Sequence, residues 1–553
     1  MICLLAALSL ATESFDPTVA EAVFNGRETW TQDETIKLWG AVERWRDPDC
    51  YLFGTETFNK VTSWPLTADH APWIAASFAT DTPDSASFLL HVGISDPNTT
   101  GTPVLMVPGA MDNGSRSFVT LATRMDRLER PVFAMTFAHP HGDIFMQAES
   151  VANAIAAIKS RTGADQVDLV GHSKGAIVAA TYASHHEGAD WSNKAYETVG
   201  TTYRGDVRRL LLVAAPLAGV DTSYRWPALN LLSLNADFAP SPTSWSTWYP
   251  SSTAWWSIFE SLADQDFAPD GLDLFPGQRQ LLARQDYPLP GSQAWLTAFA
   301  MQPDWWTTYE GGLGYWSDSD GIDAAIVDGD HFLARLAVHG VDPEIPIWIL
   351  AGSNPILPTG DLVPDIFEGA PAMTWGAMID EISDHGVSIS AADDELRGLG
   401  DGHLILGEVT GPSDGLVFIN SATDESVLTA RGARVVETRV ADLSHLDLLY
   451  ASPITGELMI EAGEANPAED GWMRTFGKRY IVEDTLGWIE EVLGDDPAAD
   501  SPDDTVGEEH FAPGMGELAG SCNGCNSTPS GSWLVLVFAA LGLPTRRLSA
   551  TGR

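Results

Sequence analysis

The sequence predicts an α/β protein in which a mostly parallel central sheet is covered by helices on both faces. Short apolar runs typical of strands alternate along the chain with stretches in which apolar residues recur at helical spacing. The strand-like runs are nearly continuous in apolar residues, which indicates burial on both faces and hence a parallel sheet. Hydrophobic residues make up 44% of the 553 residues, so disorder throughout is excluded.

The predicted elements follow one another in order along the first half of the chain. Strands are expected at Ser87–Ile94, Pro103–Val107, Pro131–Phe137, Gln166–Val170 and Leu210–Ala214. Helices are expected at Gln147–Arg161, which Gly163 can end as a C-cap, and at Ala176–Ser184. A further helix is predicted at Thr35–Arg46, within a segment, residues 12–72, that is either a separate domain or an N-terminal extension.

Acidic residues dominate the charge balance. The chain has 30 lysines and arginines against 76 aspartates and glutamates, and the formal net charge of −46 would repel the phosphates of a nucleic acid. Nucleic-acid binding is therefore excluded. Two interpretations stay open: adaptation of an exported protein to a salty medium, or a surface that attracts cations such as calcium. Only Cys50 of the four cysteines lies in the body of the chain, so no disulfide framework is expected there.

Both ends of the chain are interpreted as targeting segments. Residues 1–11 form an apolar run that ends in small residues, as in a signal peptide, although the basic start of a signal peptide is missing. Residues 494–521 form an acidic linker, and residues 522–553 combine a Cys-x-x-Cys pair, an apolar stretch and a basic end. This order resembles the myxobacterial-type C-terminal sorting tail. The resemblance implies processing near the cysteines and retention at the cell surface; a redox or half-zinc motif is the alternative. Together the two ends predict an exported protein that is either associated with the cell surface or outer membrane or extracellular.

The motif with the clearest chemistry is G-x-S-x-G. An apolar strand leads directly into Gly171-His-Ser-Lys-Gly175, and an apolar helix follows. In this arrangement the serine lies on a strained strand-to-helix turn, and the flanking glycines let neighbouring backbone approach closely. The N-terminus of the following helix favours developing negative charge. The motif predicts that Ser173 is a nucleophile, with Gly171 and Gly175 forming its elbow; a plain glycine-rich turn is the alternative.

A serine nucleophile needs a base that a third group orients. On an α/β-hydrolase fold the acid and the histidine follow the serine in that order. Asp414 follows a predicted strand at Leu406–Val409, and His445 follows another at Arg434–Val440. These two residues are the predicted acid and base. The other candidates for the two positions are Asp361, Asp393, Asp394, His385, His403 and His510.

The segments GHSKG, SDGLV and SHLD together resemble the secreted bacterial triacylglycerol lipases of the α/β-hydrolase superfamily, over roughly residues 100 to 490. The resemblance implies an α/β-hydrolase domain at residues 73–493. In it Ser173 is the nucleophile, Asp414 orients the imidazole, and His445 is the general base and acid.

The resemblance also implies an oxyanion hole made by the backbone N–H groups of Lys174 and Ala110. The chain departs from the lipase pattern here, because Pro108-Gly109 stands where the lipases have His-Gly. Proline has no N–H group, but the expected donor is two residues further on. For the Lys174 side chain two hypotheses remain, a cation that adds to the field at the oxyanion or one that points into solvent, and the second is favoured.

No cofactor is expected for the chemistry, but the lipase family carries a structural calcium between the acid and histidine loops. Asp447 matches one ligand position, and Asp393 or Asp394 falls near another. Alternatively, these carboxylates only solvate their loops. A dedicated foldase is a further partner that the resemblance raises.

A tryptophan-rich insertion is predicted to form a cap or lid at about residues 221–340. The 91 residues from Trp226 to Trp316 contain 9 of the 20 tryptophans. Loops of this length in a compact domain usually serve a function. Trp245, Trp248, Trp255, Trp256, Trp305 and Trp306 either face a lipid or form the core of a cap subdomain.

These features together predict a carboxylic ester hydrolase of the lipase type. Neutral lipid esters are preferred as substrates, because a strongly acidic protein should avoid anionic lipid surfaces. An acyltransferase or a thioesterase on the same triad is the alternative. A non-catalytic surface protein on a hydrolase scaffold is the third hypothesis.

Overall fold

The structure of the protein is a computed structural model. It describes residues 11–15, 39–46, 78–79, 86–93, 101–110, 114, 118, 121–122, 125, 130–138, 142–191, 200–221, 276–285, 322–358, 403–405, 411–445, 447–449 and 483–494.

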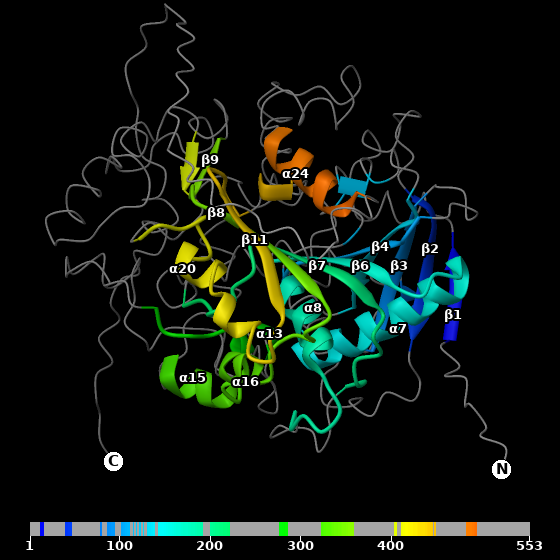
Figure 1. Cartoon of the computed structure of the whole chain (residues 1–553), viewed down its shortest axis with the longest axis horizontal. Helices are drawn as coiled ribbons and strands as arrows, with labels where there is room; N and C mark the ends of the chain where they lie inside the picture. The colour runs from blue at the N-terminus through cyan, green and yellow to red at the C-terminus, as the bar shows by residue number, and fades with distance from the viewer. Residues whose placement is uncertain are drawn as a thin grey trace, which may run out of the picture.

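A nine-stranded sheet forms the centre of the described part of the chain (Figure 1). Its strands are β1 (Ala11–Phe15), β2 (Trp39–Arg46), β3 (Ser87–Gly93), β4 (Val104–Val107), β5 (Val132–Phe137), β6 (Val167–His172), β7 (Val207–Val213), β8 (Pro346–Gly352) and β11 (Arg434–Ala441). Their order is β1-β2-β3-β5-β4-β6-β7-β8-β11. The six strands from β5 to β11 are parallel, and β1, β2 and β3 extend one edge by antiparallel pairing. The predicted mostly parallel sheet is confirmed.

Helices lie on both faces of this sheet. The described helices are α7 (Ile144–Thr162), α8 (Lys174–Ser184), α13 (Pro276–Gln280), α15 (Ile322–Asp328), α16 (Phe332–His339), α20 (Ile419–Ala422) and α24 (Glu483–Leu493), with 3-10 turns η4 (Glu425–Val427) and η5 (Asp447–Leu449). A separate pair of short strands, β9 (Ile356–Pro358) and β10 (His403–Ile405), lies outside the central sheet. None of the described helices is both long and apolar enough to cross a membrane.

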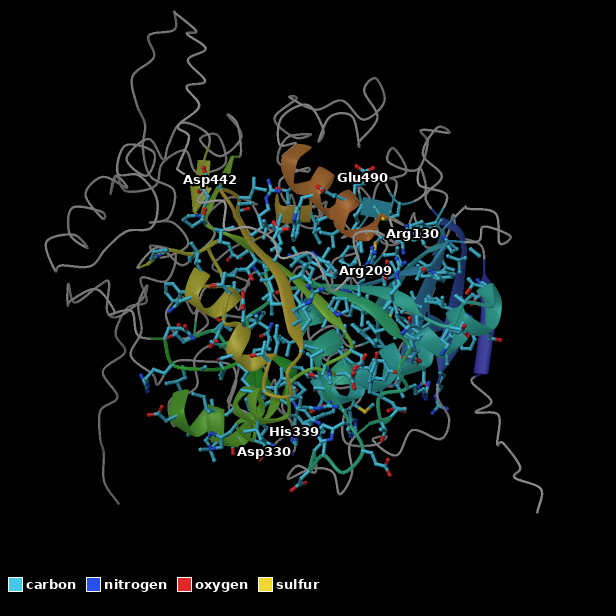
Figure 2. The ribbon with its side chains drawn as sticks, viewed as in Figure 1. Arg130, Arg209, Asp330, His339, Asp442 and Glu490 are labelled. Carbon is cyan, nitrogen blue, oxygen red and sulfur yellow. The ribbon has the colours of Figure 1, made fainter. Side chains whose placement is uncertain are left out.

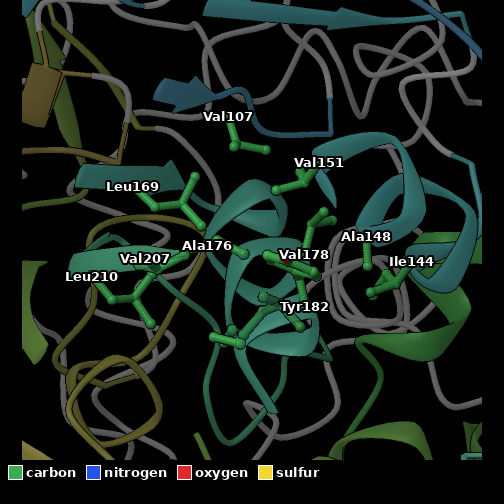
Figure 3. Close-up of a cluster of buried hydrophobic side chains, with 14 of the residues drawn as sticks. Val107, Ile144, Ala148, Val151, Leu169, Ala176, Val178, Tyr182, Val207 and Leu210 are labelled. Carbon is green, nitrogen blue, oxygen red and sulfur yellow. The ribbon is translucent and has the colours of Figure 1, made fainter. Parts of the chain in front are cut away.

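Two hydrophobic cores explain why the strands are apolar throughout. Alternate residues of a strand point to opposite faces of the sheet. Leu105 and Val107 of β4 enter the core that includes α7, α8 and α16, whereas Val104 and Met106 enter the core that includes α24. Figure 3 shows the first core, in which side chains of α8 pack among those of α7 and the strands.

Different contacts fix the helices on the two faces of the sheet. On the first face, α7 begins at the N-cap Asp143 and ends at Gly163, which has a left-handed backbone conformation as the sequence predicted. On the second face, Arg209 donates to the carbonyls of Val492 and Gly494 at 2.6 and 2.8 Å, which fixes the C-terminal end of α24. Figure 2 shows Arg130 and Arg209 close together beside this helix.

One predicted element is wrong. Residues 39–46, inside the predicted helix Thr35–Arg46, form strand β2, which pairs with β1 on one side and β3 on the other. The cause is tertiary: β2 completes the antiparallel edge of the sheet, a contact that local spacing does not encode. Within residues 12–72, the described strands therefore belong to the central sheet.

The predicted cap is described only in part. Residues 276–285 and 322–340 are described, and Phe332 of α16 packs edge-on against Phe145 of α7 at 5.0 Å between ring centroids. This end of the predicted cap is thus part of the helical layer over the sheet. The six tryptophans named for the cap, the predicted strand at 406–409, residues 1–10 and residues 495–553 lie outside the described residues.

Candidate active site

Ser173 lies between the end of β6 and the start of α8. Its backbone has φ 53° and ψ −127°, a conformation that a residue with a side chain rarely adopts. The Ser173 N–H donates to the carbonyl of Val213 at 2.8 Å, which ties the turn to the end of β7. Because this N–H is already bonded to β7, the oxyanion donor expected at this turn is the N–H of the next residue, Lys174.

The glycines of the motif are required by close backbone approach. A Cβ atom at Gly171 would collide with the first turn of α8, and one at Gly175 would collide with the carbonyl of Pro108. In the loop after β4, a Cβ atom at Gly109 would lie 3.0 Å from the Cβ of Ser173. The loop that contains the second expected oxyanion donor thus lies directly against the serine.

Asp414 and His445 form a buried hydrogen-bonded pair. The Nδ1 of His445 lies 2.8 Å from the Oδ2 of Asp414, and the side chains are 3% and 0% exposed. The Oδ1 of Asp414 accepts from the backbone N–H groups of Leu416 and Val417 at 3.0 and 2.7 Å. The backbone N–H of His445 also donates to the carbonyl of Asp414 at 2.8 Å. Both loops are therefore fixed at backbone and side-chain level.

This geometry sets the tautomer of His445. A carboxylate only accepts hydrogen bonds, so Nδ1 of His445 carries the hydrogen and Nε2 keeps a lone pair. That is the state in which an imidazole can accept a proton from a serine hydroxyl. His445 lies in the loop after β11, the strand next to β8. Figure 2 shows Asp442, at the start of this loop, far from Asp330 and His339, which lie at the opposite end of the view.

His172 links the serine turn to the histidine loop. Its Nε2 donates to the backbone carbonyl of His445 at 3.0 Å, and the two imidazole rings are 5.1 Å apart between centroids. Burial lowers the pKa of His172 to about 3, so the ring is neutral near pH 7. The sequence pattern does not single out this residue, because it occupies a variable position of G-x-S-x-G and its partner lies 273 residues away.

Of the two residues expected to form the oxyanion hole, Lys174 follows Ser173 directly and Ala110 follows Gly109, whose Cβ position lies 3.0 Å from Ser173. Lys174 is the first residue of α8, where a backbone N–H makes no bond within the helix. Ala110 is half-buried at the end of the described part of the loop after β4. The favoured hypothesis that the Lys174 side chain points into solvent is wrong. This side chain is buried and its Nζ donates to Oε1 of Gln147 on α7.

The expected calcium ligands are not brought together by what the structure describes. Asp393 and Asp394 lie outside the described residues, and Asp447 begins η5 without a described side chain. Among the described side chains no three His, Cys, Asp or Glu residues are grouped to hold a metal ion. Of the other triad candidates, only His403 is described, in the separate strand β10.

The sheet and the serine elbow together define the α/β-hydrolase fold. No protein-family description matches the chain, and no curated protein matches its sequence. It is similar in structure to the mature form of a lipase from Bacillus licheniformis, with 14% identity and a TM-score of 0.28 over 68% of this chain and 96% of the lipase. For EstA from Clostridium botulinum the identity is 12% and the TM-score 0.30, over 68% of this chain and 88% of EstA. For the siderophore hydrolase EstB from Aspergillus fumigatus the values are 14% and 0.28, over 68% of this chain and 93% of EstB.

Proposed function

We propose that this protein is a serine hydrolase that cleaves carboxylic esters through an acyl-enzyme intermediate. One arrangement carries the proposal: a strained serine at a strand-to-helix turn, joined through His172 to the loop of a buried Asp–His pair. Each group by itself has a structural explanation. They lie at the same end of the parallel strands β6, β8 and β11, which is the arrangement that a triad requires.

The reaction follows from the protonation state of His445. The Oγ of Ser173 attacks the ester carbonyl while Nε2 of His445 accepts the hydroxyl proton. The tetrahedral oxyanion accepts hydrogen bonds from the N–H groups of Lys174 and Ala110. Its collapse expels the alcohol, which takes the proton from His445. A water molecule then gives a proton to the same nitrogen, attacks the acyl-enzyme and releases the acid as the proton returns to Ser173.

Asp414 has two roles in this scheme. Its Oδ2 holds the Nδ1–H of His445 and stabilises the imidazolium that forms during attack. Its Oδ1 accepts two backbone N–H groups of its own turn, so the carboxylate cannot rotate away from the histidine. The pair is therefore preorganised before substrate binds.

As substrate class we propose neutral lipid esters. The tryptophan-rich insertion supports an apolar acyl pocket, and the formal net charge of −46 disfavours anionic lipid surfaces. We also propose export and retention at the cell surface, on the basis of the apolar start and the C-terminal tail. Mass spectrometry of the chain ends in protein isolated from the producing cells would test this location.

The direct test of the activity uses p-nitrophenyl esters from acetate to palmitate. We expect hydrolysis that rises with chain length and is lost in Ser173→Ala. The control is Ser426→Ala, which changes an exposed serine of η4. Hydrolysis by Ser173→Ala at the wild-type rate would overturn the mechanism, and a sharp preference for acetate would overturn the lipid assignment. Calcium is tested with a chelator. Loss of activity in the same assay, or a lowered unfolding temperature in a separate thermal denaturation, would indicate a bound calcium ion.

A further inference from the structure

A buried polar cluster lies behind the serine turn, where α7, α8 and α13 meet. Its centre is the side chain of Lys174, which is 1% exposed and donates from Nζ to Oε1 of Gln147, itself 3% exposed. A lysine that is almost completely buried is rare, because removing its charge from water is costly. An apolar side chain would fill the same space at a lower cost. The presence of a cation here therefore requires an explanation.

Asp143 supplies the negative charge of the cluster. Its Oδ1 caps α7 by accepting from the N–H groups of Phe145 and Met146 at 2.8 and 3.2 Å. Its Oδ2 accepts from Nε2 of Gln280 at 2.7 Å. Burial raises the pKa of Asp143 to about 6, while the nearby charge of Lys174 acts in the opposite direction. Near pH 7 Asp143 is therefore mainly ionised, and its carboxylate lies close to the Lys174 side chain.

Helix α13 closes the cluster from the third side. Gln280 of α13 also accepts from the N–H of Ile144 at 2.7 Å, which joins α13 to the start of α7. A Cβ atom at Gly277 would collide with Cε of Lys174 and with the carbonyl of Gly142. The chain of α13 thus packs directly on the end of the lysine side chain and keeps it extended toward Gln147.

We propose that Lys174 is a positioning residue, whose anchored side chain fixes the peptide group that stabilises the oxyanion. This proposal rests on the proposed function. The first peptide of a helix has no intrahelical bond to its N–H, so its orientation depends on outside contacts. The lysine side chain begins at that peptide and ends in a network with two other helices. Its backbone N–H is thereby held toward the space above Ser173 while the side chain runs away from it.

The alternative is that the cluster only stabilises the packing of α7, α8 and α13. The two explanations differ in what a loss of the cation changes. A purely structural cluster affects the unfolding transition and leaves the turnover of the folded enzyme unchanged. A positioning residue affects the transition state more than the bound substrate, so kcat falls while KM stays the same.

The experiment compares Lys174→Met with the wild type and with Lys159→Met. Methionine is unbranched like lysine, one atom shorter and uncharged. Lys159 lies on α7, is partly exposed and pairs with the buried Asp206 at 3.7 Å. We expect Lys174→Met to retain the wild-type circular dichroism spectrum and KM for p-nitrophenyl butyrate. Its kcat should fall about 100-fold, as for loss of one oxyanion donor. A boronic acid, which mimics the tetrahedral state, should bind more weakly by the same factor, and Lys159→Met should behave as the wild type.

Wild-type kcat in a folded Lys174→Met variant would overturn the proposal. If that variant does not fold, Gln147→Met decides the matter, because it removes the acceptor of the ammonium group without touching the serine turn. A fall in kcat of about 10-fold at constant KM supports positioning, and an unchanged kcat overturns it. Failure of the proposed function would appear separately, as a wild-type protein without Ser173-dependent hydrolysis.

Discussion

At the scale of single residues, the backbone of Ser173 is the feature on which the site depends. A non-glycine residue in such a conformation costs about 1–3 kcal/mol, so its surroundings must hold it there. The bond from its N–H to Val213, and the close packing of Gly171 and Gly175, provide that restraint. A strained turn of this kind projects the serine hydroxyl group out of the sheet, and Ser173 is only partly buried.

Asp414→Asn should lower kcat about 10⁴-fold with little change in stability. The asparagine can keep its oxygen on the N–H groups of Leu416 and Val417, so its NH₂ group must face His445. Nδ1 of His445 would then have to accept a hydrogen bond, and Nε2 would carry the hydrogen and lose its ability to act as a base.

Steady-state kinetics on purified Asp414→Asn would measure this effect. Asp424→Asn is the matched control, because Asp424 also caps a turn by accepting from a backbone N–H, in η4, but contacts no residue of the site. Equal kcat values in the two variants would rule out an orienting role for Asp414.

Some residues of the site could be predicted from sequence and others could not. Ser173 stands in a motif whose spacing has a local cause, and Asp414 and His445 follow it in the order that the fold imposes. The burial of Lys174 could not be predicted, since its partners Asp143 and Gln147 belong to another helix. The contact of His172 with His445 depends on the same tertiary proximity.

At the scale of elements, the strand–turn–helix unit depends on how closely α8 approaches the loop after β4. Gly175→Ala should destabilise the fold by about 1–3 kcal/mol and lower activity, because the new methyl group meets backbone that cannot rotate away. Gly487→Ala in α24 is the matched control. Among the described residues, no atom outside the neighbouring backbone of α24 lies within 4 Å of the Cβ position at Gly487, so alanine there should stabilise the helix by about 0.5–1 kcal/mol.

Chemical denaturation of both variants measures the two free energies. If Gly175→Ala is as stable and active as the wild type, the close contact between α8 and the loop after β4 is not a constraint on the site.

The strands of the sheet differ in how well their sequence predicts them. Strand β4 is buried on both faces, so its continuous apolar residues identified it. Strand β2 carries Glu43, Arg44 and Arg46 among its apolar residues, and it becomes a strand by pairing with β1 and β3 at the sheet edge. That pairing is not local, and the prediction of a helix failed there.

At the scale of the whole molecule, buried neutral histidines make stability depend on pH. Burial lowers the pKa of His91 and His172 to about 3 and that of His185 to about 4. Below pH 6.5 the unfolded chain binds protons at these positions and the folded protein does not. The stabilisation is complete above pH 6.5 and is lost as the pH falls toward 4, at about 1.4 kcal/mol per pH unit for each of the fully buried His91 and His172. The contribution of His185 is smaller, because this side chain is only partly buried and solvent screens it.

His91→Gln tests this dependence. Glutamine can keep a hydrogen bond to the Oγ1 of Thr136, which lies 2.7 Å from Nε2 of His91, but it does not titrate. Urea denaturation at pH 7, 6, 5 and 4.5 gives the unfolding free energy at each pH. Its slope against pH should be shallower in the variant by about 1.4 kcal/mol per pH unit, which corresponds to one bound proton. Identical slopes in both proteins would mean that His91 is protonated in the folded state.

The proposed mechanism requires that Ser173 forms a covalent intermediate with an ester substrate. A fluorophosphonate reacts with an activated serine and leaves a stable adduct that peptide mass spectrometry can locate. We predict one adduct per chain, on Ser173, with esterase activity falling in proportion to labelling and no labelling of Ser173→Ala. An adduct on another residue, or full activity in protein whose Ser173 stays unmodified, would contradict the account.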